Sequence, residues 1–248
     1  MKKVALITGA AGGIGRATAG VFAEAGWSVV GVDRRGEAVE GIEHMIEADM
    51  ADPESPERIF RTTEERFGRL DALVNNAAVQ ICKPVVETTA AEWDAVMASN
   101  LRSVFLSMRY AHPMLAQTKG SIINVSSVHA MATSKNIAAY AASKGALLAF
   151  TRAVALEFGA DGVRVNAVLP GAVDTPMLHA GLDRGHIDAA GTDELIRGLG
   201  RKHVLGRVGR PEEIGSVILF LADGERSSFI TGQAMVVDGG AMARLSTE

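Results

Sequence analysis

The sequence has little of what marks secreted, membrane-spanning or metal-dependent proteins. Cys82 is the only cysteine in 248 residues, so no disulfide can form within the chain and we expect a reducing, cytoplasmic setting. No run of about 18 apolar residues is present, which argues against a transmembrane helix. The apolar run Val4–Ile7 begins close to the N-terminus, so we expect no signal or transit peptide.

The sequence also lacks a large excess of either positive or negative charge. The 25 basic and 29 acidic residues give a formal net charge of −4, without long blocks of either sign. Such a surface repels nucleic acid weakly, so no nucleic-acid partner is expected. The six histidines lie far apart and none has a His-x-x-x-His or similar spacing, so we expect no metal site.

What the chain does have is a series of short apolar runs separated by stretches with helical periodicity. The runs are Val4–Ile7, Val29–Val32, Ala72–Val74, Ile122–Val125, Val163–Val168 and Met235–Val237, with a further strand expected near Glu47–Ala48. Continuously apolar strands that alternate with helices predict a parallel sheet covered on both faces. We therefore predict a single doubly wound α/β domain over residues 1–248.

Helices are expected at about residues 13–25, 54–67, 90–116, 139–158 and 211–221. Pro113 should end or kink the third of these near its last turn. The short, glycine-containing segment between the second and third strands does not favour a full crossover helix. Residues 172–208 have weak periodicity, several glycines and many charged residues. This stretch is predicted to be a substrate lid, with a pair of ordinary surface helices as the alternative.

A glycine-rich turn, Thr8–Gly15, follows the first strand and leads straight into a helix. Gly9, Gly13 and Gly15 permit a tight turn and let backbone amides approach a pyrophosphate. The helix N-terminus adds unpaired N–H groups and a positive dipole. The spacing is Gly-x-x-x-Gly-x-Gly, which differs from the commonest dinucleotide fingerprint, but the strand–turn–helix context favours a dinucleotide site.

Asp33 ends the second strand, where a carboxylate can bind both hydroxyls of an adenosine ribose and repel a 2′-phosphate. The adjacent Arg34 and Arg35 could instead hold that phosphate. The carboxylate favours NAD, with NADP as the less favoured cofactor.

Tyr140 and Lys144 lie four residues apart in a helical stretch, which places both side chains on one face. A nearby ammonium lowers the pKa of a phenol from its usual value near 10. Lowering it by about 2–3 units requires roughly 3–4 kcal/mol, more than one lysine usually provides. A second cation is therefore needed, and the oxidised nicotinamide ring is the obvious candidate.

These motifs have a common order and spacing. They are Thr8–Gly15, Asn75–Ala78, Asn100, Ser127, Tyr140 with Lys144, and Pro170 with Gly171. Together they resemble the compact branch, of about 250 residues, of the short-chain dehydrogenase/reductase family, and the resemblance covers essentially the whole chain. It implies a Rossmann-type fold and an NAD(P)-dependent oxidoreductase acting on CH–OH groups. One departure is Ala78, where the family more often has glycine.

The resemblance implies a role for each of four catalytic residues. Tyr140 would take the alcohol proton during oxidation or give it to the carbonyl during reduction. Lys144 would bind the nicotinamide ribose and lower the pKa of Tyr140. Ser127 would hold and polarise the substrate oxygen. Asn100 would hold a water that links Lys144 to bulk solvent.

The resemblance also implies a set of cofactor contacts, in which Asp49 meets adenine, Asn76 braces the central strands and Thr175 meets the nicotinamide carboxamide. The full set is Gly9, Gly13, Ile14, Gly15, Asp33, Asp49, Met50, Asn76, Ala77, Tyr140, Lys144, Pro170, Gly171 and Thr175. Family members are usually homotetramers. Apolar residues such as Val104, Phe105, Leu147 and Phe150 could form the two-fold interface here.

The expected substrate is a small polar alcohol or ketone, with a sugar or polyol as the leading candidate. His129, Ser134 and Asn136 follow the catalytic serine on a loop that should border the pocket, although His129 could be an ordinary loop residue. Ser127, His129, Asn136 and Tyr140 are the predicted substrate contacts. Two alternatives stay open: a 3-oxoacyl carrier reductase, which Asp33 disfavours, and a cofactor-sensing regulatory protein on the same fold.

Overall fold

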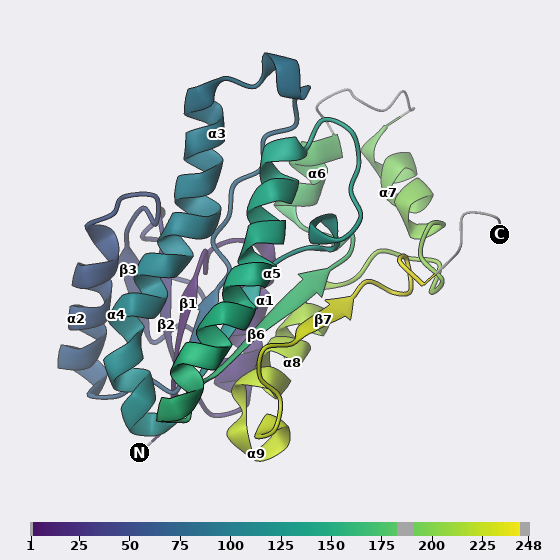
Figure 1. Cartoon of the computed structure of the whole chain (residues 1–248). Helices are drawn as coiled ribbons and strands as arrows, with labels where there is room; N and C mark the ends of the chain where they lie inside the picture. Colours follow the sequence, from purple (N-terminus) through teal and green to yellow (C-terminus); the bar gives the residue numbers. More distant parts are fainter. Residues whose placement is uncertain (1, 183–190, 244–248) are drawn as a thin grey trace.

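Seven strands form a single parallel sheet with the order β3-β2-β1-β4-β5-β6-β7 (Figure 1). The computed structural model describes residues 2–182 and 191–243. The strands are β1 Val4–Thr8, β2 Ser28–Asp33, β3 His44–Glu47, β4 Ala72–Asn75, β5 Ser121–Val125, β6 Arg164–Pro170 and β7 Ala234–Val237. The predicted doubly wound parallel sheet is therefore confirmed, with β3 starting a few residues earlier than expected.

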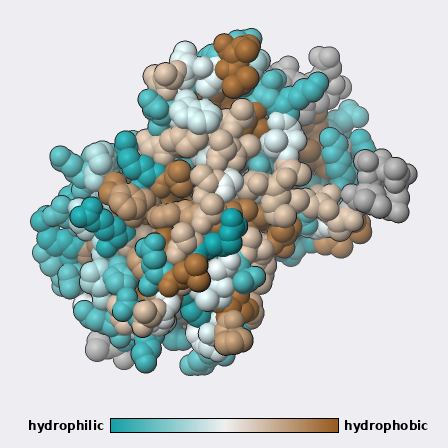
Figure 2. Space-filling view, in the orientation of Figure 1, coloured by the Kyte–Doolittle hydropathy of each residue, from teal (hydrophilic) through white to brown (hydrophobic). Residues whose placement is uncertain are grey.

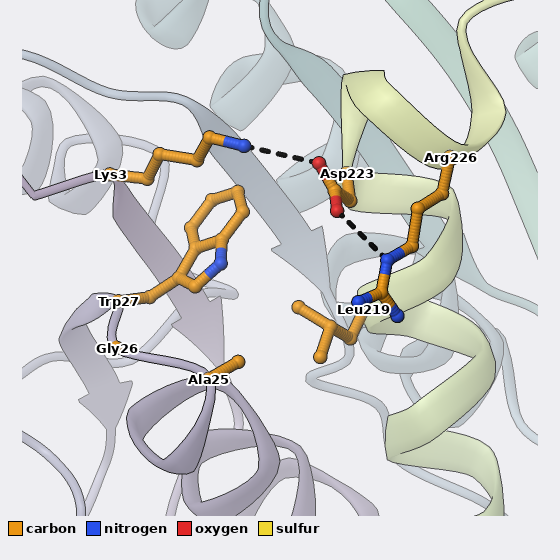
Figure 3. Close-up of a pocket in the computed structure, with 7 residues that line it drawn as sticks. All are labelled: Lys3, Ala25, Gly26, Trp27, Leu219, Asp223 and Arg226. Atoms are coloured by element: carbon orange, nitrogen blue, oxygen red, sulfur yellow. Dashed lines mark hydrogen bonds and ion pairs between the residues drawn. The ribbon is translucent and has the colours of Figure 1, made fainter.

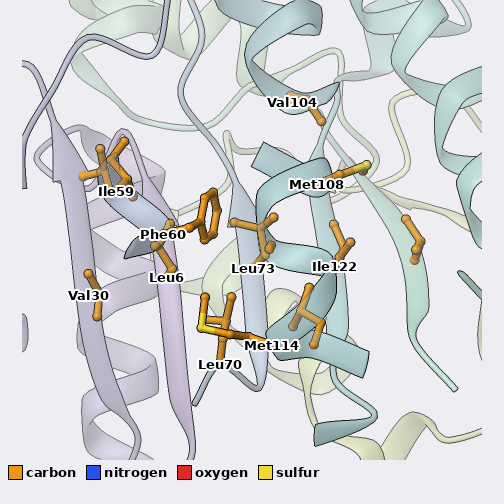
Figure 4. Packing of buried hydrophobic residues seen from close by; sticks show 14 of the residues in the cluster. Leu6, Val30, Ile59, Phe60, Leu70, Leu73, Val104, Met108, Met114 and Ile122 are labelled. Carbon is orange, nitrogen blue, oxygen red and sulfur yellow. The ribbon is translucent and has the colours of Figure 1, made fainter. Parts of the chain in front are cut away.

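Helices cover both faces of the sheet. They are α1 Gly13–Glu24, α2 Ser55–Phe67, α3 Ala90–Met97, α4 Ser103–Thr118, α5 Ala138–Phe158, α6 Pro176–Leu182, α7 Thr192–Gly200, α8 Pro211–Ala222 and α9 Gly224–Ser227. One buried cluster joins the sheet to α2, α4 and α5, and a second joins its other face to α1 and α8. Figure 4 shows the first, where Ile59, Phe60 and Met108 lie against Leu6 and Leu73.

Burial explains why the inner strands are apolar at every position. All residues of β1, β5 and β6 are buried, because helices cover both faces of these strands. The edge strand β7 differs, since Ala234 and Val236 are exposed. No helix within the two described ranges is long and apolar enough to cross a membrane.

The helix expected over residues 90–116 is divided in two. A π-helical turn, Ala98–Arg102, separates α3 from α4. The sequence predicts that Pro113 ends or kinks the helix near its last turn. The helix does not end there: α4 continues to Thr118 and stops at Lys119, which has a left-handed φ of 50°. Proline removes one N–H from the helix interior, but the buried neighbours Met114 and Leu115 keep this turn packed on the sheet.

The segment 172–208 contains α6 and α7, so its described part matches the alternative of two helices. The charged residues Asp183, Arg184, His186 and Asp188, expected to contribute to a lid, lie outside the described residues. His203 is buried, with its Nδ1 2.8 Å from the Leu199 carbonyl oxygen. As expected, no helix lies in the described residues 34–43, between β2 and β3.

The strand order reverses beside β1, which pairs with β2 on one side and β4 on the other. At such a switch point the loops after neighbouring strands diverge and leave a crevice at their carboxyl ends. The turn after β1, the end of β2 and the loop after β4 all meet this edge, so the sheet topology brings the predicted cofactor residues together.

Candidate active site

The glycine-rich turn after β1 is tied to the loop after β4. The Asn76 amide nitrogen donates to the carbonyl oxygens of Thr8, at 2.9 Å, and Gly9, at 3.1 Å. In return, the backbone N–H groups of Asn76 and Ala77 both donate to the Thr8 hydroxyl at 3.0 Å. Asn76 therefore braces the two central strands at the switch point, as predicted.

Three of the glycines in this turn are required by close contacts. A Cβ on Gly9, which has a φ of 67°, would lie 2.9 Å from the Ala77 Cα. A Cβ on Gly15 would overlap the Gly9 carbonyl oxygen and lie 2.7 Å from the Asn76 amide nitrogen. A Cβ on Gly13 would lie 2.6 Å from the methyl carbon of Thr175. The Thr175 hydroxyl donates to the Val173 carbonyl at 3.2 Å. Thr175, just before α6, therefore packs against Gly13 at the start of α1. The turn is thus compact, with its backbone amides at a helix N-terminus, which fits a pyrophosphate.

Asp33 lies against the same turn. Its carboxylate accepts from the Ala11 backbone N–H at 3.1 Å and from the Arg35 backbone N–H at 3.2 Å. The Arg35 side chain folds back, with its Nε 3.7 Å from the Asp33 carboxylate and its guanidinium 3.4 Å from the Ala11 carbonyl oxygen. Asp33 therefore lies against the glycine-rich turn, and Arg35 is paired with it rather than free.

The adenine end of the predicted site follows β3. Asp49 is exposed, and its carboxylate accepts from the Ala51 N–H at 2.9 Å. Met50 is buried in the core beneath it. The Arg102 guanidinium donates to the Ala51 carbonyl at 2.8 Å and so links this loop to the π-helical turn.

Tyr140 and Lys144 lie one turn apart on α5 and both are buried, as their spacing predicted. The Lys144 Nζ lies 5.5 Å from the centre of the Tyr140 ring and donates to the carbonyl of Val125, the last residue of β5, at 2.7 Å. The Ser126 hydroxyl donates to the Lys144 carbonyl at 3.0 Å. Val125 and Ser126, at the end of β5, thus fix both the side chain and the backbone of Lys144.

Burial changes the proton affinity of both groups. It raises the pKa of Tyr140 to about 12, although a hydrogen bond with the Ser127 hydroxyl opposes the rise. Burial lowers the pKa of Lys144 to about 8. Without a further cation, the phenol is therefore neutral at pH 7, and the lysine loses its proton before the tyrosine does.

Ser127 and His129 lie next to the Tyr140 phenol. Ser127 follows β5, and its oxygen accepts from the His129 backbone N–H at 3.2 Å. The His129 ring meets the Tyr140 ring edge-on, with centroids 6.0 Å apart, and its Nδ1 is 3.0 Å from the Thr133 hydroxyl. Burial lowers the pKa of His129, so the imidazole beside Tyr140 is neutral at pH 7.

Asn100 lies in the π-helical turn between α3 and α4, and its side-chain amide makes three hydrogen bonds. Its oxygen accepts from the Val79 N–H at 2.8 Å, and its nitrogen donates to the Val79 carbonyl at 2.9 Å and the Ser143 hydroxyl at 3.1 Å. Ser143 in turn donates to the Tyr140 carbonyl at 2.7 Å. Sequence reasoning overlooked Ser143, although its place three residues after Tyr140 puts it on the same helix face.

The remaining predicted residues border the crevice at its rim. Asn136 has a left-handed φ of 63°, and its carbonyl accepts from the Lys83 N–H at 2.6 Å, which joins the loop after β5 to the loop after β4. Ser134 is exposed. The Gly171 N–H, after Pro170, donates to the Val237 carbonyl at 3.0 Å. In the part of the chain that the structure describes, no group of three or more His, Cys, Asp or Glu side chains could hold a metal ion.

Comparison with known proteins agrees with this geometry. Residues 9–242 match the family model described as enoyl-(acyl carrier protein) reductase. The chain is 36% identical to meso-2,3-butanediol dehydrogenase of Serratia marcescens, covering 97% of this chain and 95% of that protein. It is also 36% identical to the 3-oxoacyl-(acyl-carrier-protein) reductase FabG of Thermotoga maritima, covering 96% and 97%.

A solved structure shows the same likeness in three dimensions. The aldohexose dehydrogenase of Thermoplasma acidophilum superimposes with a TM-score of 0.91 at 33% identity, covering 99% of this chain and 96% of that one. The matches span the glycine-rich turn, the strand order and the Tyr140/Lys144 helix together. The chain therefore belongs to the short-chain dehydrogenase/reductase family, and it is a dehydrogenase that acts on CH–OH groups.

Proposed function

We propose that this protein interconverts a secondary alcohol and its ketone with NAD as the hydride carrier and Tyr140 as the proton-transfer group. The observation that carries the proposal is the buried Tyr140 phenol, hydrogen-bonded to Ser127 and one helical turn from Lys144. A secondary alcohol is a very weak acid, so its oxidation needs a base, an anchor for its oxygen and an aligned hydride acceptor. Tyr140 would be the base, and Ser127 would anchor the oxygen.

The protein's part in the reaction is to move one proton. In oxidation, with Tyr140 as the phenolate, the alcohol O–H proton passes to the phenolate oxygen while the C–H hydrogen leaves as hydride and the C=O bond forms. A bound nicotinamide supplies the hydride acceptor and, when oxidised, a positive charge. Ser127 donates to the substrate oxygen and favours the charge that builds on it. Reduction follows the same path in reverse.

Lys144 and Asn100 would help to carry the proton from Tyr140 to bulk solvent. Lys144 is buried, and its Nζ donates to Val125, which fixes it below the phenol. Both amide hydrogens of Asn100 are used by Val79 and Ser143, so a water in the relay would be held by an oxygen of Asn100 rather than by its N–H groups.

The proposed preference for NAD rests on Asp33. Its carboxylate is held on the Ala11 amide, where it can bind ribose hydroxyls and repel a 2′-phosphate. The contact of Arg35 with Asp33 supports this preference, because that guanidinium is turned toward the carboxylate. The exposed Arg34 is the remaining cation beside the site.

For the substrate we propose a small polyol or sugar. His129 with Thr133, Asn136 and Ser134 place several hydrogen-bonding groups at the rim near Tyr140. Polar groups at the rim of a site favour a ligand with hydroxyl groups over an apolar one. The names of two relatives, a butanediol dehydrogenase and an aldohexose dehydrogenase, agree with such a substrate.

A second candidate is the reduction of 3-oxoacyl thioesters, favoured by the likeness to the Thermotoga maritima reductase. One panel separates the two: kcat/KM for polyols and sugars, hydroxysteroids and 3-hydroxyacyl thioesters, with NAD and NADP in parallel. A tenfold advantage for an apolar class, about 1.4 kcal/mol in transition-state binding, would overturn the polar substrate.

The Tyr140→Phe variant tests the chemistry itself. It keeps the ring and loses the transferable proton, so we expect kcat to fall by more than about a hundredfold. NADH binding, followed by fluorescence, should change little. A variant that keeps more than about one hundredth of the parent kcat would remove Tyr140 from its proposed role.

We further propose a homotetramer with two-fold symmetry. A groove of about 520 Å³ lies between the π-helical turn, α4 and α5, lined by Met97, Leu101, Phe105, Ala146 and Phe150 among others. Figure 2 shows apolar residues across the face of the molecule formed by α4 and α5. Val104 and Leu147, which the sequence placed at this interface, are instead buried in the core of the single chain, because they face the sheet. Phe105 is 45% exposed and Leu156 85%. A second copy related by a two-fold axis would cover this face.

A further inference from the structure

A pocket of about 200 Å³ lies at the amino ends of β1 and β2, at the end of the sheet opposite the active site. Figure 3 shows it between the strand ends on one side and α8 with α9 on the other. Its lining residues are Lys3, Ala25, Gly26, Trp27, Leu219, Asp223 and Arg226. The proposed dehydrogenase chemistry uses none of them.

The floor of the pocket is the indole of Trp27, which is only 8% exposed. Its ring meets Phe22 edge-on, with centroids 5.1 Å apart, and the Lys3 Nζ lies 5.4 Å from its centre. In Figure 3 the indole nitrogen is on the side of the ring that faces Leu219. The indole nitrogen is not one of the buried atoms that lack a hydrogen-bond partner among the described residues, so its N–H is open to the pocket and to water. A ligand in the pocket can therefore accept from this N–H in place of water.

Cations outnumber anions around the pocket. The Asp223 carboxylate is shared by Lys3, at 3.1 Å, and Arg226, at 3.3 Å. The lining therefore holds two cations and one carboxylate. A guanidinium with five N–H donors retains several after it has paired with Asp223. The local excess of positive charge favours an anionic ligand.

The pocket also has an apolar side, formed by Leu219, Ala25 and the face of Trp27. At roughly 30 Å³ per water-sized atom, its volume holds about six or seven non-hydrogen atoms. We propose that this pocket binds a small organic carboxylate, whose oxygens accept from the Trp27 N–H and the Arg226 guanidinium and whose short carbon chain lies on Leu219. Butyrate, with a four-carbon body, has the matching size and chemistry.

The Trp93→Phe variant provides a direct readout, because Trp27 is then the only tryptophan. Its fluorescence is titrated with butyrate at constant ionic strength, up to roughly 100 mM, since a ligand this small is expected to bind in the millimolar range. We expect a saturable change with butyrate and none with butyramide, which has the same carbon chain without the charge. An equal response to inorganic phosphate would overturn the carboxylate assignment, and a response that does not saturate would overturn the site.

Variants then test the two donors. In the Trp93→Phe background, Arg226→Gln should weaken butyrate binding by about tenfold or more, the ratio that 1.4 kcal/mol represents. Arg61→Gln, on the exposed face of α2, makes the same change in net charge and should leave binding unchanged. Trp27→Phe keeps the ring and removes the N–H, so saturation-transfer NMR of butyrate should show weaker binding, with thermal unfolding as the check on the fold. Unchanged affinity in Arg226→Gln, or equal loss in Arg61→Gln, would refute the proposal.

Discussion

In a Tyr110→Phe variant, Tyr140 is the only tyrosine of the chain, so the absorbance of its phenolate can be titrated alone. Burial raises the pKa of Tyr140 to about 12, and we expect the midpoint of the cofactor-free protein near that value. Lys144, with a pKa lowered to about 8 by burial, is already neutral at that pH and provides no charge to stabilise the phenolate.

The magnitude of the change on cofactor binding follows from the geometry. For Tyr140 to act as a base near pH 8, its pKa must fall by about 4 units, or roughly 5.4 kcal/mol. A protonated Lys144, 5.5 Å from the ring centre, contributes about 3 kcal/mol at an effective dielectric constant of about 20. About 2 kcal/mol then remains for a second cation. Oxidised NAD should therefore lower the midpoint by about 1.5 units, and NADH, without the ring charge, by less.

The titration has two internal checks. Ser127→Ala should raise the midpoint, because the hydrogen bond from that hydroxyl lowers the pKa of the phenol. The stability that burial of the neutral phenol contributes should be complete below about pH 10 and be lost as pH rises through about 12, measured by unfolding. A cofactor-free midpoint at or below 10, or equal midpoints with NAD and NADH, would refute the reasoning.

Three further measurements probe the cofactor site and the assembly. Asp33→Ala should erase or reverse the preference for NAD in kcat/KM, and a parent enzyme that prefers NADP would contradict the role given to this carboxylate. Gly15→Ala should destabilise the fold and abolish cofactor binding, because its Cβ overlaps the Gly9 carbonyl. Gly20→Ala, on the same helix with open space around it, should be neutral or stabilising by up to about 1 kcal/mol in thermal unfolding. Light scattering should give four times the 26.0 kDa chain mass, and a monomer at micromolar concentration would exclude the tetramer.

The sequence by itself was sufficient for the features that depend on neighbouring residues. The continuous apolar runs predicted buried parallel strands, because a strand covered on both faces has no polar side. The glycines of the turn after β1 and the four-residue spacing of Tyr140 and Lys144 predicted a phosphate-binding turn and a shared helix face for the same reason. Strand–turn–helix order and side-chain spacing are set by residues that are near one another in the sequence, so they do not depend on how distant elements pack.

Only the tertiary structure decided which groups meet and how they titrate. The pairing of the Asn100 amide with Val79 and Ser143 joins segments 21 and 43 residues apart, and nothing in the local sequence specifies it. The pKa values of Tyr140 and Lys144 depend on burial beneath β5 and the loop after it, which depends in turn on how α5 packs on the sheet. The continuation of α4 past Pro113 and the pocket over Trp27 also depend on how distant elements pack together. Desolvation and long-range contacts exist only once distant elements are packed together, so no local pattern could reveal them.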